Sequence, residues 1–146
     1  MRIASVQLLV LWLVAPAAAA DELGCTITNV YRHSSDGELV ADTYLEEHLV
    51  KKLFSVNTKT GAIIGTLVAN QGSVIPPEIR VGFQGDESFD FAVTSRFGKS
   101  VEFLRIRAYS KRLQEMRGGR FNGYPFLFTE GKGHFLSGLC QPLKKP

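Results

Sequence analysis

The sequence lacks the short motifs by which many enzymes are identified. It has no G-x-S-x-G turn to expose a serine nucleophile, no H-E-x-x-H pair for zinc, and no glycine-rich phosphate loop with its lysine. The nearest pair of a nucleophile and a base is Ser137 with His134. Three positions apart in a strand, these side chains would lie on opposite faces and could not touch. The sequence therefore gives no support to Ser–His catalysis, and we predict no catalytic residue.

Histidine is also scarce, with only His33, His48 and His134 in the chain. Glu46 and Glu47 precede His48, but no pair of these side chains has a spacing that is diagnostic of a metal site. His48 falls at the edge of an apolar helical stripe, where it would cap that stripe rather than bind a ligand. We therefore predict neither a metal site nor a cofactor.

Cysteine occurs only twice, as Cys25 and Cys140, which allows a single pairing in an oxidising compartment. That bridge would enclose nearly the whole folded chain and could stabilise it by about 4–5 kcal/mol on the chain-entropy argument. The alternative is a bacterial lipid anchor on Cys25. A lipidation box requires an aliphatic residue three positions earlier, where Glu22 stands, and it would leave Cys140 unpaired. We predict the Cys25–Cys140 disulfide.

Long apolar runs are missing except at the start of the chain. Met1–Arg2 gives a positive start, Ile3–Val14 is almost wholly apolar, and Ala17–Ala20 supplies the small residues that signal peptidase accepts. The run is too short to cross a bilayer comfortably, and charge follows it at once. We predict a cleavable export signal at 1–20 and one periplasmic or secreted domain at 21–146. The alternative is an uncleaved anchor helix.

Most of the remaining sequence alternates apolar and polar residues, as strands do. Turn residues separate the alternating stretches at intervals of about ten residues, which is typical of antiparallel sheets, small barrels and sandwiches. Strands are expected at 25–31, 54–56, 62–68, 79–83, 89–93 and 101–109, with a closing hairpin at 126–140. Surface loops are expected at 69–77 and 110–123, and a turn at 85–87.

One stretch, Asp42–Leu53, has the pattern of a helix. Leu45, Leu49 and Leu53 repeat every four residues, and Thr43 would begin a capping box. Three turns are too short to be stable alone, so the helix must lie against a sheet. The predicted fold class is α+β and β-rich: a mainly antiparallel sheet, barrel-like or sandwich-like, with one packed helix in the N-terminal half.

In the stretch Val101–Tyr109 the apolar residues do not all fall on one face of a strand, so the stretch has a mixed phase. Val101 and Phe103 are odd-numbered, whereas Leu104 and Ile106 are even-numbered. One face cannot bury both sets, because side chains alternate strictly along a strand. We expect either a bulge near positions 103 and 104 or a strand that is covered on both faces.

Positive charge gathers in one segment. Positions 96–120 hold eight basic and two acidic residues, a formal charge of +6, whereas the rest of the mature chain carries −4. Such a segment can attract anionic partners, although a solvated face that keeps the domain in solution is the plainer alternative. Asp90, between Phe89 and Phe91, is expected to point outward as a solvated polar residue.

The parity of the strand gives this basic segment a shape. If Leu104, Ile106 and Ala108 face the core, the odd-numbered side chains share the other face. Arg105 and Arg107 then lie together, and paired guanidiniums bind phosphate or carboxylate bidentately. The candidate anion-binding residues are Arg105, Arg107, Tyr109, Lys111, Arg112, Arg117 and Arg120.

These features predict an exported, non-catalytic binding or structural module. Its partner would be an anionic polymer, a lipid head group or an acidic protein, held on the basic face. Two alternatives stay open. One is a secreted hydrolase with a site near His134, and the other is an exported inhibitor that offers its basic loop to an acidic enzyme cleft.

Overall fold

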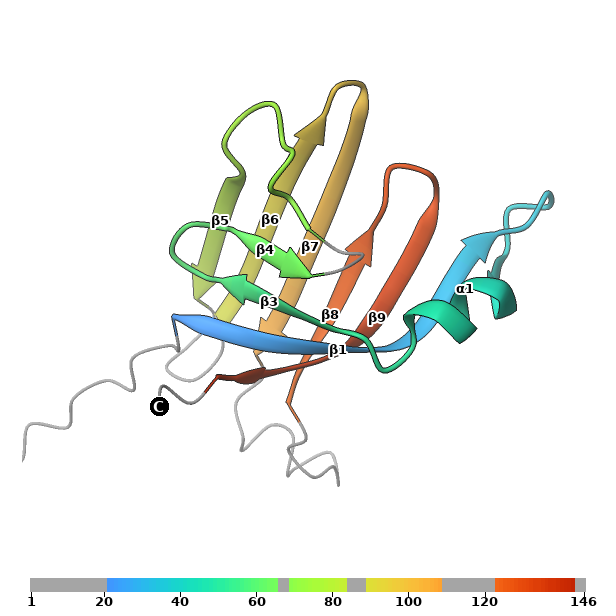
Figure 1. The fold of residues 1–146 in the computed structure, drawn as a ribbon, viewed down its shortest axis with the longest axis horizontal. Helices are drawn as coiled ribbons and strands as arrows, with labels where there is room; N and C mark the ends of the chain where they lie inside the picture. Colours follow the sequence, from blue (N-terminus) through green and yellow to red (C-terminus); the bar gives the residue numbers. More distant parts are fainter. Residues whose placement is uncertain (1–20, 66–68, 84–88, 109–122, 144–146) are drawn as a thin grey trace, which may run out of the picture.

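The computed structural model describes residues 21–65, 69–83, 89–108 and 123–143. They form nine strands and one short helix (Figure 1). In chain order the elements are β1 (Glu22–His33), β2 (Leu39–Ala41), α1 (Thr43–Leu49), β3 (Leu53–Asn57), β4 (Ile63–Gly65), β5 (Glu78–Phe83), β6 (Phe89–Phe97), β7 (Ser100–Ala108), β8 (Tyr124–Thr129) and β9 (His134–Pro142).

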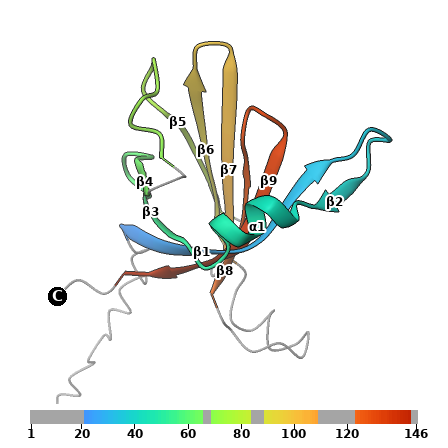
Figure 2. The same cartoon turned by 45° about the vertical axis from the view of Figure 1, so that its right-hand side comes forward.

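All the strands belong to one antiparallel sheet, in the order β4-β3-β1-β9-β8-β7-β6-β5, with β2 added beside the far end of β1. The sheet curls into a half-barrel, so that β1, β3 and β4 cross in front of β6, β7 and β8 (Figure 1). Turning the molecule shows that the end of β1 and its partner β2 project away from the rest (Figure 2). The predicted β-rich α+β class is therefore confirmed.

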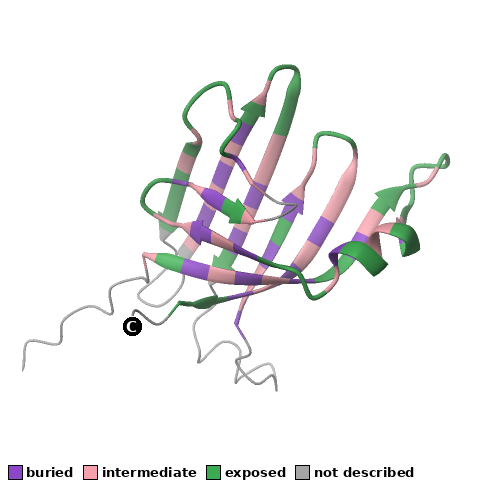
Figure 3. Ribbon diagram, viewed as in Figure 1, coloured by how far each residue is buried: buried purple, intermediate pink, exposed green. Residues whose placement is uncertain are grey.

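The core lies on the inner side of the curl. Buried and exposed residues alternate along the strands (Figure 3), because successive side chains point to opposite faces of a sheet. The ring of Phe54 in β3 meets the ring of Phe126 in β8 edge-on, with centroids 5.1 Å apart, and this contact joins the two halves of the curl. Other residues that are nearly inaccessible to solvent include Ile27, Val30, Val56, Phe91, Val93, Leu104, Ile106, Phe128 and Leu136.

The predicted disulfide is confirmed. Cys25 of β1 and Cys140 of β9 are direct partners in the strand register, and they are joined by a bond that spans 115 positions of sequence. Both cysteines are completely buried, and no free cysteine is found among the described residues. The bridge therefore fastens the strand nearest the start of the domain to the strand nearest its end.

A bulge in β1 explains one glycine of β9. The β1–β9 register shifts between Ile27 and Asn29, and Gly138 lies opposite Ile27 at that point. A Cβ atom on Gly138 would overlap the carbonyl oxygen of Thr26 and would press on the ring of Phe126. Only glycine allows the two backbones to approach so closely.

Asn70, in the loop before β5, ties β4 to β6 across the curl. Its side-chain Oδ1 accepts a hydrogen bond from the backbone N–H of Ile63 in β4 at 2.8 Å. Its Nδ2 donates to the carbonyl of Gly61 at 2.7 Å and to Oγ of Ser95 in β6 at 3.1 Å. Asn70 and Ser95 are both buried, where unpaired polar groups would be costly. Asn70 thus satisfies the edge of β4 while holding it against β6.

The helix is shorter than the sequence pattern predicts. It ends at Leu49, and Lys51 then takes a left-handed backbone conformation with φ of 68°. Its N-cap is Asp42, which accepts a hydrogen bond from the N–H of Leu45, so the predicted capping role of Thr43 is wrong. Leu53 is also misplaced in the prediction: it begins β3 and is 68% exposed. The helix does pack on β1, as expected.

The mixed phase of β7 is resolved without a bulge. Its register with β6 runs without a shift from Phe97–Ser100 to Phe89–Ala108. Leu104 and Ile106 take the inner face, and Val101 is left half-exposed on the other. The predicted bulge is therefore wrong.

The predicted turn at 85–87 and most of the loop predicted at 110–123 lie outside the described residues. Among those described, no helix is long and apolar enough to cross a membrane.

Candidate functional site

Arg105 and Arg107 lie side by side on the outer face of β7. Leu104 and Ile106 alternate with them and are fully buried, so the two arginines must point away from the core. This arrangement confirms the orientation expected from the sequence. The arginine side chains are 42% and 46% exposed, respectively.

Asp90 of β6 holds both arginines. It is the direct register partner of Arg107. Nε of Arg105 donates to Oδ1 of Asp90 at 2.8 Å, and Nη2 of the same guanidinium donates to Oδ2. Nε of Arg107 is 3.7 Å from Oδ2. Asp90 therefore points outward as predicted, but it is an ion-pair partner rather than a simply solvated residue.

The two arginines alter the titration of this carboxyl group. Its pKa is lowered, chiefly by the hydrogen bond from Arg105 and further by the positive charges of both guanidiniums, although burial acts in the opposite direction. Asp90 is therefore ionised at neutral pH. We call Asp90, Arg105 and Arg107 the arginine cluster; its formal charge is +1.

The other predicted anion-binding residues lie outside the described part of the chain: Tyr109, Lys111, Arg112, Arg117 and Arg120. Two further arginines lie on the same outer face. Arg96 of β6 is the register partner of Val101, and Arg80 of β5 is opposite Ala92 of β6, which is in turn opposite Arg105. Arg80 forms an ion pair of 3.0 Å with Glu78 on its own strand. The outer face of β5–β7 thus carries four arginines and two acids among the residues that can be placed.

Comparison with known protein families, with characterised proteins and with solved structures finds no match for this chain. We therefore infer function from the geometry of the chain's own residues.

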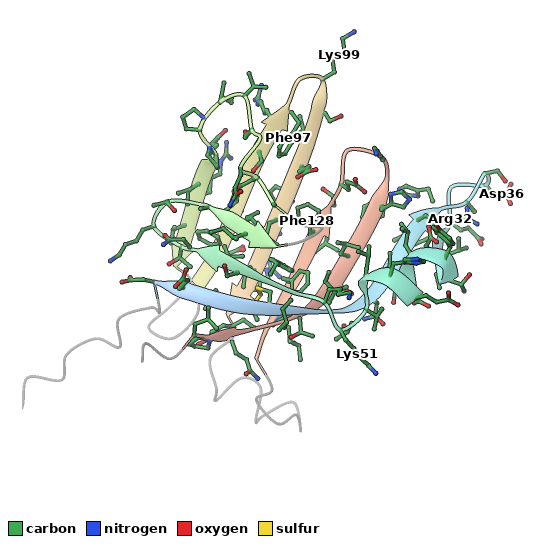
Figure 4. All side chains as sticks on the ribbon, in the orientation of Figure 1. Arg32, Asp36, Lys51, Phe97, Lys99 and Phe128 are labelled. Atoms are coloured by element: carbon green, nitrogen blue, oxygen red, sulfur yellow. A yellow bond between two sulfur atoms is a disulfide. The ribbon has the colours of Figure 1, made fainter. Side chains whose placement is uncertain are left out.

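A second group of charged residues lies at the inner rim of the half-barrel, beside α1. Arg32 of β1 is the register partner of His134 of β9, and Figure 4 shows Arg32 close to the helix. Nδ1 of His134 is 3.1 Å from Oε2 of Glu130, and Nε2 is 3.7 Å from Oδ2 of Asp42. Arg32 Nε lies 4.0 Å from the same Asp42 oxygen. We call Arg32, Asp42, Glu130 and His134 the rim cluster.

The sequence does not reveal the rim cluster, because its members come from four places in the chain. The β1–β9 register brings Arg32 to His134, the β8–β9 turn adds Glu130, and the start of α1 adds Asp42. Asp42 also caps the helix. The cluster therefore links the closing hairpin to the helix and to β1.

The rim cluster lacks a nucleophile. Ser137, the hydroxyl nearest to His134 in the sequence, accepts a hydrogen bond from the side chain of Asn29. Its strand parity places it on the face of β9 opposite to that of His134 and Leu136. No group of three or more potential metal ligands occurs among the described residues. The contacts of His134 join β9 to the β8–β9 turn and to the start of α1.

The remaining histidines do not join either cluster. Nδ1 of His48 is 2.8 Å from the carbonyl oxygen of Tyr44, one helical turn earlier, and the two rings are in contact. The ring of His33 meets Phe135 edge-on at 5.0 Å. His48 therefore stays with its own helix, and His33 supports the projecting end of β1.

Glu102 lies beside the rim, as the register partner of buried Ser95. Its pKa is raised, first by burial and then by repulsion from Glu130. An acid whose pKa is raised by folding binds more protons in the folded state than in the unfolded state. Its contribution to the free energy of unfolding therefore becomes unfavourable as the pH rises from the unfolded-state pKa to the folded-state pKa. Deprotonated Glu102 therefore destabilises the fold at neutral pH.

Substitution Glu102→Gln should consequently increase the free energy of unfolding at pH 7. The gain should shrink as the pH falls to about 3, where the glutamate is protonated in both states. Urea unfolding at the two pH values measures the difference. Glu38→Gln, which changes an exposed carboxylate in the turn before β2, is the control and should have little effect. A Glu102→Gln variant that is less stable than the wild type at pH 7 would show that the carboxylate makes a favourable contact.

Proposed function

We propose that this protein is an exported, non-catalytic binding module that holds an anionic partner on the outer face of β6 and β7. The arginine cluster carries the proposal. Two guanidiniums lie side by side on a regular sheet face, partly exposed, and oriented by one carboxylate. Guanidinium groups bind phosphate and carboxylate through paired N–H donors, which suits them to anionic polymers, lipid head groups and acidic proteins alike.

Asp90 strengthens this proposal rather than weakening it. A long arginine side chain loses considerable conformational entropy when it is fixed by a ligand. Here Asp90 already orients the guanidinium group of Arg105 through hydrogen bonds and attracts that of Arg107. The partner would meet a group that is ordered in advance, while the cluster keeps its net positive charge.

Export is supported by two independent features. The first twenty residues have the layout of a cleavable signal. The Cys25–Cys140 disulfide is of a kind that persists in oxidising compartments such as the periplasm or the cell exterior. We therefore place the mature protein in one of these compartments.

The two alternative functions have less support. A hydrolase near His134 would need a nucleophile or an activated water, and the rim cluster consists of one imidazole, two carboxylates and one guanidinium, with no hydroxyl or thiol among its members. An inhibitor that inserts its basic loop would depend on positions 110–122, which lie outside the described residues. Binding by the arginine cluster rests on side chains whose contacts with Asp90 are described.

Neutralising the two arginines should weaken anion binding without unfolding the protein. The double variant Arg105→Gln/Arg107→Gln should elute from an anionic resin at clearly lower salt than the wild type, because fewer counterions are released on binding. Its melting temperature should change little, since partly exposed ion pairs contribute little to stability. Glutamine is preferred to glutamate here because two added acids would repel Asp90.

The matched control is Lys51→Gln/Lys52→Gln, which removes the same charge from exposed residues after α1. Figure 4 shows Lys51 pointing into solvent. If both double variants elute together, net charge alone governs retention and the proposed site is wrong.

A further inference from the structure

β5 forms one end of the sheet, and none of the described residues pairs with its outer edge. Among the described residues, β5 pairs with β6 alone, over six consecutive residues with no shift in register. In an antiparallel strand, alternate residues direct both their N–H and their C=O groups to the same side. The regular backbone of β5 therefore presents a row of donors and acceptors at its free edge.

Natural proteins usually protect such an edge with lysine, proline, a bulge or an inward-pointing charge. β5 has none of these between Glu78 and Phe83. Its two charged residues, Glu78 and Arg80, form an ion pair with each other and share the outer face of the strand. Their opposite charges cancel, so they give the edge little electrostatic protection.

The apolar inner face of the sheet also continues to this edge, where Val81 stays half-exposed. Val81 is the register partner of Phe91 on β6, which is only 1% exposed, yet Val81 itself is 50% exposed. One strand further along the sheet would bury the rest of the valine side chain. Both the backbone and the side chains of β5 are therefore suited to pairing with another strand.

We propose that β5 pairs antiparallel with β5 of a second copy of this chain, with the two-fold axis at Val81. This register pairs positions 79–83 of each copy and brings the two Val81 side chains together. An axis at Arg80 would place like charges directly opposite each other, which is destabilising. An axis at Ile79 would draw Pro76 and Pro77 into the pairing, and proline cannot donate the hydrogen bonds that a ladder needs.

The symmetry of this pairing has a consequence for the rest of the molecule. A two-fold axis perpendicular to the sheet keeps the outer face of both copies on the same side.

The interface consists of one short strand from each copy, which is small for a stable dimer. We therefore expect weak association that depends on protein concentration.

Sedimentation velocity of the protein purified from the exported fraction tests the pairing, with samples from micromolar to millimolar concentration. The wild type should shift from monomer to dimer across this range. Val81→Lys should raise the dissociation constant by at least about tenfold, because each copy would bring a charge to the two-fold axis. Val101→Lys is the control: Val101 is also 50% exposed but lies on the outer face of β7, away from the edge, and this variant should dimerise like the wild type.

A wild type that stays monomeric throughout the range overturns the proposal, as does a dimer that Val81→Lys leaves intact. If Val81→Lys proves unfolded by circular dichroism, Val81→Cys decides the question. Mild oxidation should link two Val81→Cys copies through the new thiol, and failure to cross-link at concentrations where the wild type dimerises contradicts the register. Binding of an extended apolar peptide to a strictly monomeric wild type would show that the edge receives another chain instead.

Discussion

Removal of the disulfide should lower the free energy of unfolding by about 2–5 kcal/mol, the range seen when small exported domains lose a native bridge. The bond between Cys25 and Cys140 spans 115 positions, so it restricts the unfolded chain far more than it restricts the folded one. The double variant Cys25→Ser/Cys140→Ser is the cleanest test, because a single substitution would leave a reactive thiol. Chemical denaturation of the variant beside the oxidised wild type measures the loss.

Reduced wild type serves as the control for the two serines. Both cysteines are completely buried, so a new hydroxyl group there adds a cost of its own, and the reduced protein separates that cost from the loss of the bond. Thiol titration of the unfolded, unreduced protein should find no free thiol. Two titratable thiols would refute the bridge and with it the expected loss of stability.

Phe91→Ala should lower the free energy of unfolding by about 3–5 kcal/mol, which is typical of truncating a buried aromatic residue. Phe91 is 1% exposed and lies on the inner face of β6, between its partners Val81 of β5 and Ile106 of β7. The substitution removes a full ring and leaves a cavity that a regular sheet cannot close by shifting one strand. Urea unfolding monitored by circular dichroism gives the difference.

Phe103→Ala provides the comparison within the same sheet. Phe103 lies on the outer face of β7 and is only partly buried. Phe103→Ala should therefore lower the free energy of unfolding clearly less than Phe91→Ala does. A cost below about 1 kcal/mol for Phe91→Ala, or equal costs for the two variants, would mean that the inner face has been wrongly assigned.

Local patterns in the sequence predict the faces of the strands well. The even-numbered parity of Leu104 and Ile106 correctly places Arg105 and Arg107 outside the core. The partner of these arginines depends instead on register. The structure turns at Gly98, which has φ of 60°, and Lys99, at the tip of the hairpin (Figure 4). Phe97 then faces Ser100, and the same register brings Asp90 to Arg107. The strands expected at 89–93 and 101–109 leave the turn between them undefined, so the sequence does not reveal this pair.

The helix boundary could not be read from periodicity alone. Leu45, Leu49 and Leu53 have helical spacing, but Leu53 belongs to β3, where it is the register partner of Thr26. The backbone near Lys51 bonds to Ile27 at the bulge of β1, and this contact ends the helix. A tertiary contact thus overrides a local preference, as is common for short helices.

Contacts between distant parts of the chain were the least accessible to prediction. β2 has three residues, too few for any pattern to emerge, and the rim cluster requires the β1–β9 register to be known in advance. Asn70 is similar: a polar residue in a loop gives no sign that it will be buried between β4 and β6. Such residues are identified only when their hydrogen-bond partners are in place.

The position of the disulfide has a mechanical consequence. Cys25 and Cys140 are direct partners on neighbouring strands, and few described residues lie outside the bridge, from Asp21 before it to Leu143 after it. Tension applied through those outer segments passes from β1 to β9 through the covalent bond. Among the described residues, the strands enclosed by the bridge are shielded from most of that load. Force applied outside the two cysteines would therefore extend this domain very little.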